Sequence, residues 1–308
     1  MSEAPGGHTP VLMDAVRELL AVQPGETVVD ATLGLGGHAR MFADAIGPGG
    51  TLIGLDVDPE ALDLSRANLT GSPCRIELRQ ANFCELPGTL REMGVTGVDA
   101  LFADLGMNSP QLDNPTRGLS FQREGPLDMR LDPRLTTTAA DLVNRLSERE
   151  LGDLIYYHSQ ETGARRIAKF ICQARRNGRI MTTTRLAAIV ADALGVDPES
   201  HKSKIHPATK AFLALRIAVN DETGCLTALL EAAPSVLKPG GRFGIIAFHS
   251  VEDKPIKLDF RRRKAERIYD ILTKKPIVAD EGERRSNPRS RSAKLRVAVR
   301  LPASNQSS

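Results

Sequence analysis

Residues 28–38 read Val-Val-Asp-Ala-Thr-Leu-Gly-Leu-Gly-Gly-His, and this stretch decides the fold. The paired valines are typical of the end of a buried strand, and three glycines follow where a strand turns into a helix. Residues 38–45 have the composition of that helix. Glycines at such a turn let the backbone approach a ligand, and a helix N-terminus offers unpaired N–H groups. The stretch therefore predicts an α/β fold with a ligand at its first strand–helix turn.

Carboxylates at the ends of three expected strands indicate what kind of ligand this is. The second strand, residues 51–55, ends in Asp56, where a carboxylate can accept both hydroxyls of a ribose. The glycine pattern alone also fits a loose dinucleotide fingerprint, which leaves a nicotinamide oxidoreductase open. Two features favour S-adenosylmethionine. Asp30 precedes the glycines, where it can face a cationic amino-acid end, and Asp104 ends a later strand, where a methyl acceptor would lie.

Two further strands are expected in the first third of the chain. Residues 75–79 form the third strand and residues 98–103 the fourth. In a doubly wound sheet the turn after the third strand also borders the ligand crevice. Asn82 there could bond an adenine and Phe83 could pack on its ring, with a core position for Phe83 as an equal alternative.

The middle of the chain changes character. Residues 107–133 read as a long polar loop, and no strand pattern occurs between Thr138 and Lys204. Capping and glycine signals predict helices at about 148–157, 164–176 and 185–194. We therefore expect a methyltransferase-like domain at 1–133, an inserted all-helical domain at 134–204, and the second part of the first domain, with a basic C-terminal segment, at 205–308.

The last hundred residues return to the α/β pattern. We expect a helix at 208–220, a fifth strand at 242–248 after a tight turn, a charged helix at 257–272 and a final strand at 294–301. Residues 261–300 hold 14 Lys/Arg against 5 Asp/Glu, although the net charge of the chain is only +3. This basic segment favours a polyanionic partner, with a solvated basic tail as an equal alternative.

Composition is ordinary for a soluble globular protein of 308 residues, with 41% hydrophobic and 26% charged side chains. The four cysteines form no C-x-x-C pair, which favours reduced thiols and a cytoplasmic location. No stretch has the length and apolarity of a membrane span. Composition leaves the oligomeric state open between monomer and homodimer.

Motifs from end to end resemble those of the bacterial small-subunit (16S) rRNA cytosine-N4 methyltransferase family, MraW/RsmH. The glycine turn is shared widely, but the ordered set is specific. It comprises His8-Thr9-Pro10-Val11-Leu12, Asp30-Ala31-Thr32-Leu33-Gly34, Asp104-Leu105-Gly106, Ser109-Pro110-Gln111-Leu112-Asp113, Arg117-Gly118-Leu119-Ser120-Phe121, Gly125-Pro126-Leu127-Asp128-Met129-Arg130, His206-Pro207-Ala208-Thr209, Phe248-His249-Ser250 and Asn287-Pro288-Arg289-Ser290-Arg291-Ser292.

This resemblance implies a class I S-adenosylmethionine-dependent methyltransferase fold, Rossmann-like and doubly wound, with an all-helical insertion. It implies methylation of the exocyclic N4 amine of a cytidine in the decoding region of 16S rRNA within the small ribosomal subunit. It places cofactor contacts on Gly36, Gly37, His38, Asp56, Phe83, Asp104 and Gln111. The chain departs from the family pattern at Met107, Asn108 and Leu213, and Leu213 loses hydrogen-bonding ability.

The reaction needs an acceptor for the N–H of a poorly nucleophilic amine, and Asp104 is the first candidate. Its alternative is a cofactor contact without a chemical role, and Asn108 and Ser109 are weaker candidates. Because duplex RNA hides its base edges, the target must be unpaired or flipped. Phe121 could stack on the target base or belong to the core of its loop.

Other residues are candidates for the RNA side of the site. Arg117, Arg130, Arg289 and Arg291 could bind phosphates, with structural salt bridges as equal alternatives. His249 is expected at the pocket rim and not in a hydrolase triad, since no nucleophile elbow accompanies it. His201 and His206 lack companion ligands, so no catalytic metal is expected.

Three rival functions stay open. The first is methylation of DNA or free nucleotides, and the second is a non-catalytic RNA-binding or assembly factor that retains the fold. The third is the nicotinamide oxidoreductase.

Overall fold

The computed structural model describes residues 10–196 and 206–302, and divides them between two compact units. We call Met1–Gly106 with Thr223–Ser308 the sheet unit, and residues 107–222 the helical unit. His8, Thr9 and His201, which the sequence analysis singled out, lie outside the described residues. Within the described ranges, no helix has both the length and the apolarity that a membrane crossing requires.

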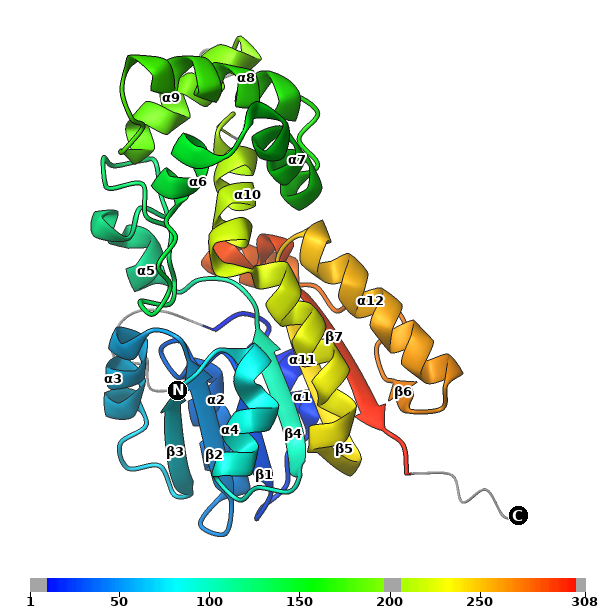
Figure 1. The fold of residues 1–308 in the computed structure, drawn as a ribbon. Coiled ribbons are helices and arrows are strands. Elements are labelled where there is room, and N and C mark those ends of the chain that lie inside the picture. The colour runs from blue at the N-terminus through cyan, green and yellow to red at the C-terminus, as the bar shows by residue number, and fades with distance from the viewer. Residues whose placement is uncertain (1–9, 197–205, 303–308) are drawn as a thin grey trace. The chain divides into compact units, whose positions relative to one another are not determined.

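The sheet unit is built on seven strands in the order β3-β2-β1-β4-β5-β7-β6 (Figure 1). Their bounds are β1 Thr27–Asp30, β2 Thr51–Asp56, β3 Arg75–Gln80, β4 Val98–Asp104, β5 Leu237–Ala247, β6 Tyr269–Ile271 and β7 Lys294–Arg300. The first five strands pair in parallel, and β7 runs antiparallel between β5 and β6. Strand order reverses between β1 and β4, which is where an open α/β sheet binds ligands. The doubly wound fold predicted from the sequence is confirmed.

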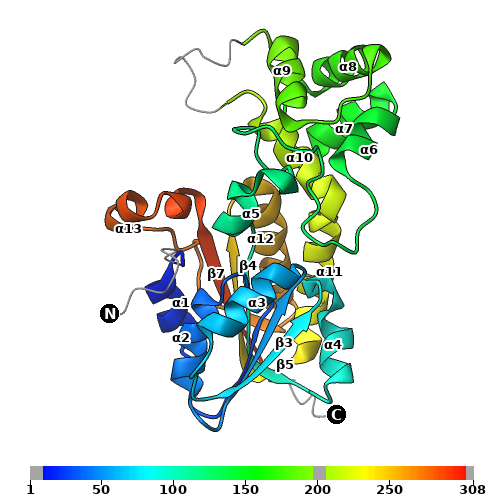
Figure 2. The same cartoon turned by 90° about the vertical axis from the view of Figure 1, so that its left-hand side faces the viewer.

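Helices cover both faces of this sheet. They are α1 (Met13–Leu20), α2 (Gly37–Ile46), α3 (Pro59–Asn68), α4 (Leu86–Glu92), α11 (Glu222–Val236), α12 (Ser250–Ala265) and α13 (Glu281–Ser286), with 3-10 turns η1 (Phe83–Glu85) and η4 (Pro288–Ser292). The apolar sides of α1, α2 and α3 share one core with the sheet, and those of α4, α11 and α12 share another. Figure 2 shows α1 and α2 on one side of the strands and α4 and α11 on the other. Burial on both faces explains why the parallel strands read as continuous apolar runs.

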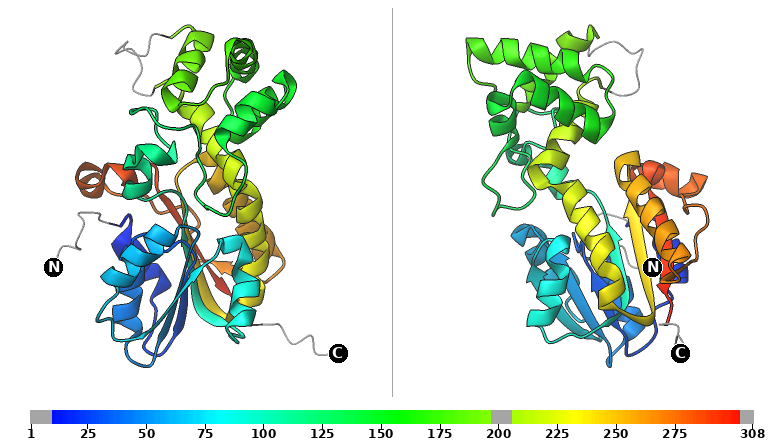
Figure 3. Two further views of the ribbon diagram at one scale, coloured as in Figure 1. Left: turned by 60° about the vertical axis from the view of Figure 1, so that its left-hand side comes forward. Right: turned by 45° about the vertical axis from the view of Figure 1, so that its right-hand side comes forward.

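The helical unit comprises α5 (Ser109–Asp113), η2 (Pro115–Arg117), α6 (Ala139–Arg145), α7 (Glu148–Ser159), α8 (Ala164–Ala174), η3 (Arg175–Asn177), α9 (Thr183–Leu194) and α10 (Thr209–Asn220). Helix α10 packs against α7 and α6 (Figure 3). Its Phe212 and Leu215 share one apolar core with Leu127 and Met129 of the preceding segment. This shared core makes the unit wider than the 134–204 insertion expected from the sequence.

Several boundaries differ from the sequence-based expectation. Helix α12 begins at Ser250 and ends at Ala265, and the end of the predicted helix is instead the strand β6. Tyr269 explains the strand, because it is 1% exposed and pairs with Arg300 of β7. The predicted turn before the fifth strand lies within β5, which begins at Leu237. Helices α6 and α11 were not predicted, and the loop-like segment 107–133 contains α5 and η2.

Candidate active site

Three carboxylates lie at the carboxyl ends of three adjacent parallel strands. Asp56 ends β2, Asp30 ends β1 and Asp104 ends β4. Asp30 pairs in register with Gly54 on one side and Phe102 on the other. Asp30 and Asp104 therefore flank the point where strand order reverses, and Asp56 lies one strand away from it.

The glycine turn joins β1 to α2 through left-handed backbone. Gly34 has φ 53° and Gly36 has φ 79°, values that favour glycine. A Cβ on Gly36 would lie 3.3 Å from Cβ of Ser65, and one on Gly37 would lie 2.3 Å from Cγ of Pro10. A side chain is thus disfavoured at Gly36 by the left-handed backbone, and at Gly37 by a clash with Pro10.

Asp56 ties the glycine turn to the second strand. Its Oδ2 accepts the N–H of Gly34 at 2.8 Å, and its Oδ1 accepts the N–H of Asp58 at 2.9 Å. Burial raises the pKa of Asp56 to about 6. Each carboxylate oxygen has a second lone pair, so hydroxyl donors can still be accepted. Asp58 caps α3 by accepting the N–H of Glu60 at 3.1 Å, so its carboxylate has a structural role.

Asp30 is a buried carboxylate that no Lys or Arg of the described chain contacts as an ion pair. It is 1% exposed, and its Oδ1 accepts the N–H of Thr32 at 3.2 Å. Burial, together with a smaller effect of the charge of Asp56, raises the pKa of Asp30 to about 7. Within residues 10–196 and 206–302, no Lys or Arg side chain forms an ion pair with Asp30, Asp56 or Asp104. Carboxylates held in this way favour a ligand that brings its own positive charge.

Asp104 is held close to the buried ring of His38. Its backbone N–H donates to Oγ1 of Thr32 at 2.6 Å, and its Oδ2 lies 3.7 Å from Nδ1 of His38. His38 Nε2 lies 3.0 Å from the carbonyl oxygen of Val11. Because a carbonyl only accepts, Nε2 carries the proton, and in a neutral ring Nδ1 faces Asp104 as an acceptor. The ring also packs on Phe102, with centroids 4.7 Å apart.

Asp104 itself has one unsatisfied oxygen. A quarter of its side chain is exposed, yet Oδ1 is inaccessible and has no hydrogen-bond partner within the described chain. Burial raises the pKa of Asp104 well above its usual range, and the charges of Asp30 and Glu252 raise it further. This combination suits a site that receives both a cation and an N–H donor.

Glu252 and Thr32 were missed as site residues in the sequence analysis. Glu252 is buried in the first turn of α12, and its Oε2 accepts the N–H of Phe248 at 2.8 Å. His249 Nε2 lies 3.0 Å from Oε1 of Glu252. The spacing of three between His249 and Glu252 is that of a capping box, and it could have identified the pair. His249 is the N-cap of α12, and β5 ends at Ala247, one residue before the end of the predicted strand.

Phe83 follows the strand next to Asp56. It is half-buried in η1 and packs against the core on the α4 and α11 side of the sheet. Asn82 caps η1, with its Oδ1 accepting the N–H of Cys84 at 3.2 Å. The structure therefore gives both residues a structural contact, and their predicted contacts with an adenine stay predictions.

Five of the predicted site residues belong to the helical unit. Asn108 caps α5: its Oδ1 accepts the N–H of Gln111 at 2.9 Å, and its own N–H donates to Oε1 of Gln111 at 3.2 Å. Arg130 donates to both carboxylate oxygens of Asp128 at 2.7 Å. Arg117 donates to the carbonyl of Leu131 at 3.2 Å. For Arg130 the salt-bridge alternative is therefore present in the structure.

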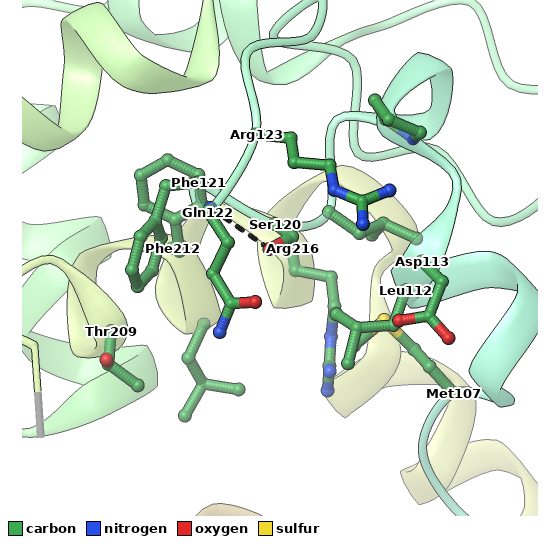
Figure 4. Close-up of a pocket in the computed structure, with 13 residues that line it drawn as sticks. Met107, Leu112, Asp113, Ser120, Phe121, Gln122, Arg123, Thr209, Phe212 and Arg216 are labelled. Carbon is green, nitrogen blue, oxygen red and sulfur yellow. Dashed lines mark hydrogen bonds between the residues drawn. The ribbon is translucent and has the colours of Figure 1, made fainter.

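Phe121 lines a pocket of about 360 Å³ in the helical unit (Figure 4). Its ring lies 4.9 Å from that of Phe212 and 4.5 Å from that of His206. Figure 4 shows the two phenylalanines together on one wall and Met107 on the other. Leu213 also lines this pocket, so its departure from the family pattern adds apolar surface. These ring contacts are those expected if Phe121 belongs to the core of its loop, the alternative to stacking on the target base.

The predicted basic residues of the C-terminal segment lie in η4. Arg291 is exposed and Arg289 is half-buried. Ser290 between them is 1% exposed, and its hydroxyl donates to the carbonyl of Asn287 at 2.8 Å. This anchored turn holds the Arg291 side chain at the surface, where a phosphate contact requires it.

Comparison with known proteins assigns this chain to a family. The model of the MraW methylase family matches residues 6–301. The chain belongs to the MraW methylase family. The family prediction made from the motifs is thereby confirmed.

Two curated relatives cover nearly the whole chain. Ribosomal RNA small subunit methyltransferase H of Acidobacterium capsulatum is 46% identical over 298 residues, covering 94% of this chain and 97% of that protein. The protein of the same name from Geobacter sulfurreducens is 45% identical over 309 residues, covering 96% and 99%. Among solved structures, an rRNA methylase from Streptococcus thermophilus aligns over 94% of both chains, with 13% identity and a TM-score of 0.41.

Proposed function

We propose that this member of the MraW methylase family transfers a methyl group from S-adenosylmethionine to the N4 amine of a cytidine in the decoding region of 16S rRNA. Curated relatives at 45–46% identity carry the name ribosomal RNA small subunit methyltransferase H. The observation that carries the chemical part is Asp104, a carboxyl group with an unsatisfied buried oxygen beside two further unpaired carboxylates. The enzyme acts in the cytoplasm, on rRNA within the small ribosomal subunit.

The residues at the switch point fit this cofactor. Three carboxylates that pair with no Lys or Arg of the described chain suit a ligand that carries a sulfonium and an ammonium group. Gly36 and Gly37 lie at the start of α2, where the N–H groups of a helix N-terminus can face a ligand, and Asp56 can accept ribose hydroxyls. When bound, the cofactor supplies an electrophilic methyl group on a positively charged sulfur.

Asp104 holds the amine that receives the methyl group. A nearby cation lowers the pKa of a carboxyl group, so a bound cationic donor would favour the ionised form of Asp104. In that form Asp104 would accept one N–H of the cytosine amine and orient the amine for attack. As positive charge passes to the nitrogen, the same carboxylate stabilises it. His38 limits the movement of Asp104, because its ring is fixed by Val11 and Phe102.

The contacts of Gln111 with the cofactor, and of Asn108, Arg117, Phe121 and Arg130 with RNA, stay predictions from the sequence. The same holds for His249, Arg289 and Arg291. Among the four arginines, Arg291 is the best candidate for a phosphate contact, because it is exposed on an anchored turn.

The test is Asp104→Asn, which keeps the shape and removes the charge. We expect methyl transfer to purified small subunits to fall by roughly 10²–10³-fold, the loss typical for one electrostatic contact to a transition state. Calorimetry with S-adenosylhomocysteine should still show binding. Asp44→Asn, which removes an exposed carboxylate of α2, is the matched control. Unchanged transfer by Asp104→Asn would contradict the assigned role. Equal transfer to DNA would contradict the assigned substrate.

A further inference from the structure

Two cysteines of the sheet unit lie in direct sulfur contact. Cys84 belongs to η1 and Cys225 to α11, and the two are separated by 141 positions in the chain. The Sγ atom of Cys225 lies 3.3 Å from that of Cys84, and neither cysteine is part of a disulfide. The sequence analysis read all four cysteines as scattered reduced thiols, because nothing in their spacing shows this contact.

The two thiols differ in accessibility. Cys84 is half-buried, whereas Cys225 is 7% exposed. An oxidant therefore reaches Cys84 first, and Cys225 is in place to resolve the oxidised form. Cys74 and Cys172 are each 9% exposed. Burial also raises the pKa of the Cys74 thiol, which disfavours its reactive thiolate form.

A metal ion fits this pair poorly. Protein zinc sites use three or four ligands. Over residues 10–196 and 206–302, neither cysteine belongs to a group of three His, Cys, Asp or Glu residues close enough to share an ion. A disulfide needs only the two sulfur atoms, and a bond of about 2.05 Å requires them to approach by a little more than 1 Å.

We propose that Cys84 and Cys225 form an oxidation site at which a hydroperoxide produces a reversible disulfide. The Cys84 thiolate attacks the peroxide, the O–O bond breaks, and Cys84 becomes a sulfenic acid while hydroxide or alkoxide leaves. The Cys225 sulfur then attacks the Cys84 sulfur, the S–O bond breaks, and water leaves as the S–S bond forms. The protein loses two protons and two electrons, which the peroxide accepts.

The disulfide is expected to act on the edge of the cofactor site. Cys84 directly follows Phe83, and Asn82 caps the same turn through the N–H of Cys84. Helix α11 is anchored in the core by Leu226, Leu229 and Leu230, so η1 moves more than α11 when the sulfur atoms approach. Movement of η1 displaces Phe83. This consequence for cofactor binding rests on the proposed function, but formation of the disulfide does not.

Peptide mapping of the full chain under non-reducing conditions, after hydrogen peroxide and alkylation, tests the proposal. We expect a linkage between the Cys84 and Cys225 peptides that dithiothreitol reverses, while Cys74 and Cys172 stay alkylated. In Cys225→Ser, the linkage should be absent and a dimedone adduct should appear on Cys84. Random pairing among the cysteines would overturn the proposal. So would the absence of a Cys84–Cys225 linkage in a protein whose Cys74 is oxidised as fast as Cys84.

Calorimetry with S-adenosylhomocysteine tests the consequence. The oxidised protein should bind several-fold more weakly than the reduced protein, and peroxide should not change binding by Cys225→Ser. Equal binding by linked and reduced protein would overturn the coupling to Phe83. A reduced protein that does not bind S-adenosylhomocysteine would instead contradict the proposed function and leave the disulfide intact.

Discussion

Replacement of Asp30 by asparagine is expected to stabilise the protein, increasingly so as the pH rises. The folded protein holds the pKa of this carboxyl at about 7, against 3.8 as its ordinary value. The folded state therefore binds more protons than the unfolded state between these two pH values, and wild-type stability falls as the pH rises through this window. Asparagine does not ionise, and its amide oxygen can still accept the N–H of Thr32.

The size of the effect follows from the two pKa values. One pKa unit corresponds to about 1.4 kcal/mol, so the full difference corresponds to about 4 kcal/mol at pH 8. Part of it is already lost at pH 5, because the unfolded carboxyl is ionised there. Between pH 5 and pH 8, the advantage of Asp30→Asn should thus grow by about 2–3 kcal/mol.

Urea unfolding of both proteins at pH 5, 6, 7 and 8 measures this advantage. Taking the difference between variant and wild type removes the contributions of groups that titrate equally in both. Asp44→Asn again controls for the loss of one negative charge. A difference that does not change with pH would refute the reasoning, since it would mean that Asp30 ionises in the folded protein as it does in water.

Three further outcomes concern the helical unit. Gly118→Ala should destabilise this unit by several kcal/mol. The backbone φ is 66° at this position, and a Cβ would lie 2.1 Å from the carbonyl oxygen of Pro126. Thermal unfolding measures the effect, and an unchanged Tm would contradict the prediction. Arg216→Met should lower the free energy of unfolding, measured in urea, by about 3 kcal/mol. Its largely buried partner Glu222, at 2.7 Å, would be left with an uncompensated charge. A decrease below about 1 kcal/mol, which is typical of a surface pair, would show that the pair is solvated. Asp128→Asn should make stability decline less steeply as the pH falls below 4. Hydrogen bonds from Arg130 hold the pKa of Asp128 below its usual range, so the wild-type protein loses this stabilisation when Asp128 is protonated. The same decline below pH 4 in variant and wild type would contradict the prediction.

The switch-point carboxylates were predictable because local rules place them. Asp30, Asp56 and Asp104 each follow a short apolar run, and the carboxyl ends of parallel strands meet at one edge of a sheet. The capping role of Asp58 was readable because its signals lie within three residues. The glycine turn was readable because left-handed backbone selects glycine.

Other features depend on contacts between distant segments. The strand β6 forms because it pairs with β7, a contact that the local sequence does not show. The charged sequence before β6 therefore led to a predicted helix that ran through it. Helix α10 belongs to the helical unit because of the core it shares with Leu127 and Met129, which its own periodicity does not reveal. Helix α11 is different. Its buried Cys225, Leu226, Leu229, Leu230 and Ala233 lie at helical spacing, so it was readable from the sequence and was missed.

The charge of the site also separates the proposed donor from a nicotinamide dinucleotide. A dinucleotide brings a pyrophosphate with two negative charges, and no lysine or arginine pairs with any of the three switch-point carboxylates in the described chain. Its binding would bring negative charge close to carboxyl groups whose pKa values burial and neighbouring carboxylates already raise. A sulfonium has the opposite effect, because it lowers those pKa values and recovers part of the cost of burying the carboxylates. The methylated donor should therefore bind more tightly than its neutral-sulfur product, and this difference in affinity should grow as the pH rises from 6 to 8. The ratio of the two dissociation constants over that range measures how much of the donor's affinity comes from the carboxylates.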